Sequence, residues 1–141
     1  MIPMRDGIKL HTVIFSPVDA KHNLPVLLQR TPYGANGSDA PDDTTFNVQA
    51  FGTSLGMMLR EGYFLVFQDI RGKYKSEGEM EIHQPLIHST IKGAVDESTD
   101  TWDTVDWLLK NLKGIAVKGG SLVFHMAVGW PWLVPLILTR H

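Results

Sequence analysis

A chain of 141 residues is long enough for one domain, and 43% hydrophobic with 20% charged residues is an ordinary globular composition. The net charge of −2 provides no basic excess to neutralise a phosphate backbone, so nucleic-acid binding is not expected. The absence of cysteine excludes a disulfide framework, a thiol nucleophile and a zinc–thiolate site.

The N-terminal segment predicts an antiparallel opening to the fold. Residues 1–7 contain no charged-then-apolar leader, so no signal peptide is expected and a cytoplasmic location is the default. Asp6-Gly7 is a turn signal, and the β-branched and aromatic residues between Ile8 and Phe15 predict a strand after it.

Two apolar runs further along predict strands that are buried on both faces. They cover residues 24–28 and 63–67. Between them lie a polar loop over residues 34–43 and a segment from Phe46 to Arg60 that has helical apolar spacing. A strand, a helix and a strand in this order predict a parallel crossover and hence an α/β fold.

A helix is predicted after residue 98. Thr99 or Asp100 is expected to cap it, and Lys110, Lys113 and Gly114 mark its end. The expected apolar stripe consists of Trp102, Val105, Leu108 or Leu109, and Leu112. We expect this helix to lead into another buried strand.

Polar motifs follow both buried strands. Residues 30–34 read Arg-Thr-Pro-Tyr-Gly, and residues 68–74 read Gln-Asp-Ile-Arg-Gly-Lys-Tyr. The carboxyl ends of parallel strands line the usual ligand crevice of such sheets, so both motifs are candidates for a site. The simpler alternatives are that Tyr33 is an ordinary loop residue and that Asp69 and Arg71 form a local ion pair.

In these motifs the sequence resembles a known family of hydrolases. The ordered segments are Met4-Arg5-Asp6-Gly7-Ile8-Lys9-Leu10, Arg30-Thr31-Pro32-Tyr33, residues 67–74 with Ser76 and Gly78, and Trp102-Asp103-Thr104-Val105-Asp106-Trp107-Leu108. Over about residues 1–114 the chain is similar to the N-terminal part of the cocaine esterase, α-amino-acid ester hydrolase and X-Pro dipeptidyl-peptidase family (CocE/NonD).

The resemblance implies the N-terminal part of an α/β-hydrolase fold and a Ser-Asp-His triad. It implies hydrolysis of small esters, amino-acid esters or X-Pro dipeptides without a cofactor, and it assigns the Tyr33 hydroxyl as an oxyanion-hole donor. A fixed phenol suits this role, because its O–H stabilises the charge that develops on a tetrahedral oxygen.

The nucleophile expected from the resemblance is absent from this sequence. A Gly-x-Ser-x-Gly elbow should follow one strand after the Trp102 helix, but Gly119-Gly120-Ser121-Leu122-Val123 lacks the second glycine, and the downstream acid and histidine are missing. Gly52-Thr53-Ser54-Leu55-Gly56 matches the pattern, yet it precedes the second buried strand. We therefore expect Ser54 to lie on a covering helix.

The histidines do not predict a metal site. His83 and His88 are five residues apart with no cysteine nearby, a poor ligand spacing. The remaining histidines show no convergent partners in the sequence: His11, His22, His125 and His141.

The tail, residues 115–141, differs in character from residues 1–114. Lys118, His125 and two prolines interrupt its apolar run, so a membrane span is not expected. When the last base of each codon is read with the first two of the next, residues 122–130 permit Gly-Ile-Ser-Tyr-Gly-Gly-Trp-Leu, and Met126 forces one of these glycines. We therefore expect a frameshift near Gly114 that replaced the nucleophile strand and ended the chain early.

The expected organisation is a partial hydrolase domain over residues 1–114 followed by a frameshifted tail over residues 115–141. Such a chain is expected to be inactive, with the edge beside the Val26 strand unpaired unless residues 122–128 cover it, and therefore to be poorly soluble or molten. Two alternatives stay open: a non-catalytic binding remnant with the Tyr33 crevice, and a short hydrolase that uses Ser54.

Overall fold

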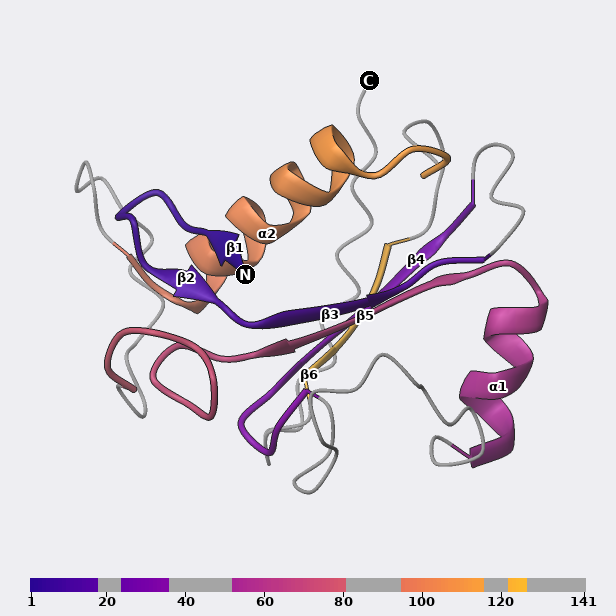
Figure 1. Ribbon diagram of the computed structural model, residues 1–141, viewed down its shortest axis with the longest axis horizontal. Coiled ribbons are helices and arrows are strands. Elements are labelled where there is room, and N and C mark those ends of the chain that lie inside the picture. The colour runs from indigo at the N-terminus through magenta and orange to yellow at the C-terminus, as the bar shows by residue number, and fades with distance from the viewer. Residues whose placement is uncertain (18–23, 36–51, 81–94, 116–121, 127–141) are drawn as a thin grey trace.

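The computed structural model describes residues 1–17, 24–35, 52–80, 95–115 and 122–126 (Figure 1). Both expected buried strands and both expected helices are present, and the part of the first helix predicted over residues 46–51 lies outside the described residues. The elements in chain order are β1 (Ile2–Pro3), β2 (Lys9–Leu10), β3 (Thr12–Phe15), β4 (Val26–Thr31), α1 (Gly52–Arg60), β5 (Phe64–Asp69), α2 (Glu97–Asn111) and β6 (Leu122–Met126).

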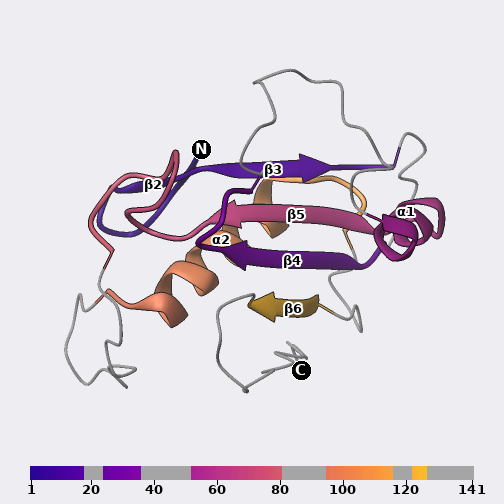
Figure 2. The same ribbon diagram turned by 90° about the horizontal axis from the view of Figure 1, so that it is seen from below.

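The main sheet has the strand order β3-β5-β4-β6. β3 runs antiparallel to β5, whereas β4 is parallel to both β5 and β6, as Figure 2 shows. β1 and β2 form a separate antiparallel pair. The antiparallel opening and the parallel crossover are therefore confirmed.

The single strand predicted from Ile8 to Phe15 is divided at His11. The backbone N–H of His11 donates to the Ser76 hydroxyl at 2.8 Å and not to a neighbouring strand, while its carbonyl accepts the N–H of Asp69 at 3.0 Å. β2 thus pairs with β1, and β3 pairs with β5.

The two helices cover opposite faces of the sheet (Figure 1). Alternate residues of a strand point to opposite faces, so Phe64 and Val66 of β5 pack on the α2 side while Leu65 and Phe67 pack on the α1 side. Burial on both faces explains why β4 and β5 are almost continuously apolar.

Helix α2 begins earlier than predicted. Its N-cap is Asp96, whose side chain accepts the N–H of Thr99 at 2.8 Å, while the Thr99 hydroxyl accepts the N–H of Asp96 at 2.9 Å. The cap predicted at Thr99 or Asp100 is wrong, because Thr99 is the third residue of a reciprocal capping box.

The buried stripe of α2 is also partly different from the prediction. Val105 and Leu108 are buried as expected, but Trp102 is 48% exposed. Asp100 and Thr104 occupy the buried face instead. Both are polar, which is why apolar spacing did not find them.

The edge of β4 that was expected to be unpaired is covered. β6 pairs with it in parallel, from Val26 opposite Leu122 to Arg30 opposite Met126. This is the case that the sequence left open, in which residues 122–128 cover the edge, so an unpaired β4 edge gives no reason to expect poor solubility. A cooperative thermal transition of the purified chain would test the expectation itself. Among the described helices, none combines the length and apolar character that crossing a membrane requires.

Candidate functional site

Tyr33 lies in a turn directly after β4. The residue is 63% exposed, and no described residue hydrogen-bonds to its hydroxyl. The Tyr33 N–H donates to the Thr31 hydroxyl at 3.1 Å, and Gly34 follows with a φ of +97°. A side chain at Gly34 would meet the ring of Tyr74 at 3.3 Å, so this turn suits glycine on both conformational and steric grounds.

Asp69 lies beneath this turn at the end of β5. Its side chain is only 1% exposed, and Oδ1 accepts the N–H of Ala35 at 2.6 Å. Its other oxygen, Oδ2, lies 2.8 Å from Nδ1 of His11. One buried carboxylate thus joins the Tyr33 turn to the segment before β3.

Two interpretations made from the sequence are corrected by this geometry. Asp69 and Arg71 do not form an ion pair, because Asp69 contacts His11 and Ala35 while Arg71 contacts Asp100. His11 does have a convergent partner. The register of β3 against β5, which the sequence does not reveal, places His11 beside the end of β5.

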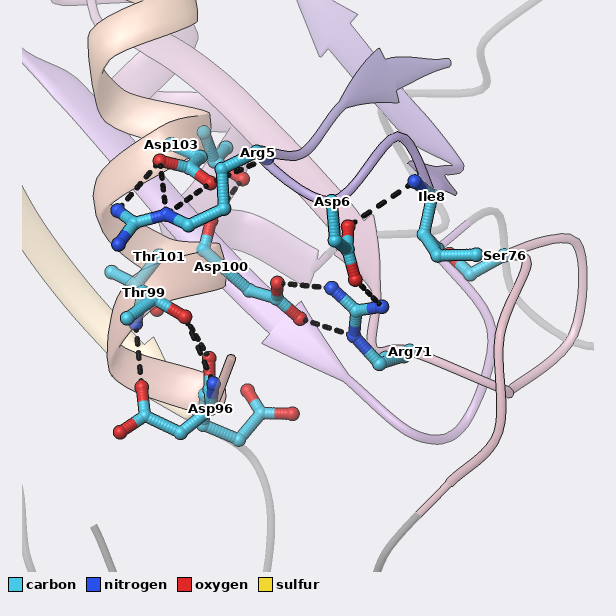
Figure 3. Close-up of polar contacts among 12 residues, drawn as sticks. Arg5, Asp6, Ile8, Arg71, Ser76, Asp96, Thr99, Asp100, Thr101 and Asp103 are labelled. Carbon is cyan, nitrogen blue, oxygen red and sulfur yellow. Dashed lines mark hydrogen bonds and ion pairs between the residues drawn. The ribbon is translucent and has the colours of Figure 1, made fainter. Parts of the chain in front are cut away.

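An ion-pair network joins the N-terminal turn and the segment after β5 to α2 (Figure 3). Arg71 lies between two carboxylates: Nη1 is 2.7 Å from Asp6, and Nε and Nη2 hold Asp100 at 3.0 and 2.6 Å. Arg5 binds Asp103 with contacts of 2.8 to 3.2 Å. The segments that carried the family resemblance therefore meet in one place.

Arg30 extends this network into the core from β4. The side chain is completely buried, and its Nε donates to Gln68 at 2.9 Å. Nη1 donates to the carboxylate and the carbonyl of Glu97, and Nη2 lies 3.8 Å from Asp100. Asp100, itself 2% exposed, is thus shared by two arginines.

Hydrogen bonds in the network lower the pKa of two carboxyl groups. For Asp6 and Asp103 the largest single influence is partial burial, which raises the pKa. The hydrogen bonds from Arg71 to Asp6 and from Arg5 to Asp103, together with those from backbone N–H groups, lower the pKa by more than burial raises it, so the net shift of both groups is downward. The pKa of the N-cap Asp96 is lowered in the same way, against burial, by Ser98 and Thr99.

These shifts predict a loss of stability in acid. A carboxyl group whose folded pKa lies below its unfolded value of about 3.9 stabilises the fold fully above that value and loses this contribution as the pH falls through the folded pKa. We expect the urea concentration at the unfolding midpoint to decrease as the pH is lowered below about 4, on account of Asp6, Asp96 and Asp103. Asp103→Asn should reduce the acid dependence, and equal midpoints at neutral pH and well below the carboxyl pKa would contradict the prediction.

The segment after β5 turns back tightly at Gly72. Gly72 has a φ of +67°, and a Cβ there would lie 2.2 Å from the backbone nitrogen of Met80. Gly7 has a comparable φ of +88°, but a Cβ there would meet nothing within 4 Å. The two glycines thus share a backbone conformation and differ in the space around them.

This pair separates backbone strain from steric conflict. Gly7→Ala should cost about 1–2 kcal/mol, the strain of a left-handed residue, whereas Gly72→Ala should cost about 2–4 kcal/mol because the chain must also shift. Urea unfolding of both variants measures the difference. Equal losses would show that the close approach of Met80 does not constrain this segment.

Ser54 lies within helix α1, as expected, whereas a nucleophile elbow holds its serine at the turn between a strand and a helix. The described residues contain no group of three or more His, Asp and Glu side chains that could hold a metal ion. His22, His83, His88 and His141 lie outside the described residues, as does Ser121.

The family of the chain follows from a match over most of its length. Residues 6–129 match the X-Pro dipeptidyl-peptidase (S15 family). The chain belongs to this family. Members of the S15 family are hydrolases, and the matched range contains Tyr33, Asp69 and, apart from Arg5, the α2 ion-pair network.

A curated relative and two solved structures similar to this chain agree with this placement. The cocaine esterase of Rhodococcus sp. (strain MB1 Bresler) is 37% identical over 110 residues, which are 78% of this chain and 16% of the esterase. An α-amino acid ester hydrolase structure is 40% identical with a TM-score of 0.65, covering 89% of this chain and 20% of the hydrolase. An aminopeptidase from a marine sediment Thaumarchaeota archaeon is 36% identical, with a TM-score of 0.64, 88% of this chain covered and 20% of the aminopeptidase.

The α/β-hydrolase fold predicted from the sequence is confirmed. A CocE/NonD family hydrolase from Staphylococcus aureus, 21% identical with a TM-score of 0.52, supports the fold alone; it aligns over 88% of this chain and 21% of that hydrolase. The chain thus spans about one fifth or less of the cocaine esterase, the α-amino acid ester hydrolase and the aminopeptidase. Tyr33 as oxyanion-hole donor stays a prediction.

Proposed function

We propose that this chain is the N-terminal part of a serine hydrolase that cleaves esters, amino-acid esters or X-Pro dipeptides, and that the 141-residue chain itself is inactive. The family supports the reaction class, since its relatives include a cocaine esterase and an α-amino acid ester hydrolase. Inactivity is proposed because the sequence has no strand that leads into a Gly-x-Ser-x-Gly elbow and no triad.

The position of β6 carries this proposal. β6 lies beside β4, where the resemblance implies the nucleophile strand, yet residues 122–126 read Leu-Val-Phe-His-Met without a serine. An out-of-frame reading of this same stretch permits the elbow. We therefore propose that a frameshift near Gly114 separates residues 1–114 from residues 115–141.

Tyr33 is proposed as an oxyanion-hole donor in the intact hydrolase. Its turn follows the carboxyl end of β4, the residue is exposed, and its hydroxyl has no hydrogen-bond partner among the described residues. A hydroxyl in this place would donate to the oxygen of a tetrahedral intermediate, together with the N–H that follows the nucleophile.

Sequencing the coding DNA from the Leu108 codon past the stop, with translation of all three forward frames, tests the proposal. We expect another frame to continue with Gly-x-Ser-Tyr-Gly and, later, an acid and a histidine. If every other frame closes quickly or lacks the elbow, the frameshift is wrong. A binding remnant that keeps the Tyr33 turn would then be the function to test, and a serine-reactive phosphonate would show whether Ser54 reacts.

A further inference from the structure

We propose that Asp69 is a positioning residue that sets the conformation of the Tyr33 turn, and that His11 orients the Asp69 carboxylate. The proposal rests on the function proposed for Tyr33. An oxyanion-hole donor acts only if its hydroxyl is held at a fixed place before the reaction, so the elements that fix its turn matter for the rate.

The turn is fastened on both sides of Tyr33 by side-chain acceptors. Before it, the Thr31 hydroxyl accepts the N–H of Tyr33 itself at 3.1 Å. After it, Asp69 Oδ1 accepts the N–H of Ala35 at 2.6 Å, a short bond to a charged acceptor. Asp69 is the last residue of β5 and pairs in register with Thr31, so a central strand supports the turn from below.

His11 determines which way the Asp69 carboxylate faces. Its Nδ1 lies 2.8 Å from Oδ2, so the two carboxylate oxygens have separate partners. A rotation of the carboxylate would break one or both contacts. The backbone of His11 is held as well, since its N–H donates to Ser76 and its carbonyl accepts the N–H of Asp69 at 3.0 Å.

Both partners of Asp69 lie outside its own strand. Ala35 belongs to the turn after β4, and His11 precedes β3. A carboxylate needed only for the core would be replaceable by an apolar side chain, whereas this one connects the turn to a third segment. The arrangement therefore transmits the position of His11 to the Tyr33 turn.

Amide hydrogen exchange of Ala35, followed by NMR in the full 141-residue chain, tests the proposal without any turnover. Asp69→Asn replaces the charged acceptor with a weaker neutral one, so Ala35 should exchange about tenfold faster while Val66, in the middle of β5, is unchanged. Asp103→Asn, which removes a carboxylate of α2 that binds Arg5, should leave Ala35 unchanged and is the matched control.

Two variants of His11 keep the test decisive if Asp69→Asn unfolds the chain. His11→Ala removes the partner of Oδ2 and should accelerate Ala35 exchange, whereas His11→Asn, whose side-chain amide takes the place of Nδ1, should restore protection. Equal exchange in both variants, or an unprotected Ala35 in the unmodified chain, would overturn the proposal. If Tyr33 is not an oxyanion-hole donor, Tyr33→Phe will leave the activity of the full-length hydrolase unchanged while the exchange result at Ala35 stands. The failure of the proposed function and the failure of this proposal are therefore distinguishable.

Discussion

Asp100→Asn is expected to lower the free energy of unfolding by about 3–5 kcal/mol, the usual cost of removing one partner from a buried ion pair. Asp100 is 2% exposed and holds Arg71 through two hydrogen bonds of 3.0 and 2.6 Å. It also lies 3.8 Å from Nη2 of Arg30, the one buried side-chain nitrogen or oxygen atom in the described residues that has no hydrogen-bond partner. The neutral amide would leave the charge of a completely buried arginine less compensated.

Urea unfolding measures this loss, and Asp106→Asn is the matched control on the same helix. Asp106 forms an exposed pair with Lys110 four residues on, so its replacement should change stability by no more than about 0.5 kcal/mol. A similar loss in both variants would mean that general helix effects, and not the shared arginines, explain the result.

The strands β4 and β5 could be predicted because burial on both faces leaves an almost continuous apolar run. Their carboxyl ends then located the Tyr33 turn. The start of α2 was harder to predict than these strands. Asp96, Thr99 and Asp100 are all good capping residues, and only the reciprocal hydrogen bonds of the capping box decide among them.

The partners of the charged residues could not be predicted, because tertiary structure sets them. Arg71 is two residues from Asp69 in the sequence, yet it binds Asp100, 29 residues away, and Asp6, 65 residues away. Asp69 is turned instead toward His11 and Ala35, 58 and 34 residues away. Closeness in the sequence favoured an ion pair between Asp69 and Arg71, whereas the packing of α2 on the sheet pairs Arg71 with Asp100.

Tyr33→Phe is expected to reduce kcat about 10²–10³-fold in the full-length hydrolase obtained by restoring the reading frame, because the loss of one oxyanion-hole donor has this effect. KM should change little, since the hydroxyl acts on the charge of the transition state and not on the bound substrate. Phenylalanine keeps the ring. The two hydrogen bonds that hold the turn, from the N–H of Tyr33 to the Thr31 side chain and from the N–H of Ala35 to the Asp69 side chain, do not involve the Tyr33 hydroxyl.

Tyr74→Phe is the matched control for this prediction. Tyr74 is also exposed, and its ring lies against Gly34 of the same turn, but no oxyanion role is proposed for its hydroxyl. Its replacement should leave kcat essentially unchanged. A comparable loss of kcat in both variants would indicate that the turn tolerates no change at either tyrosine. Full activity of Tyr33→Phe would show that another group in the hydrolase is the oxyanion-hole donor.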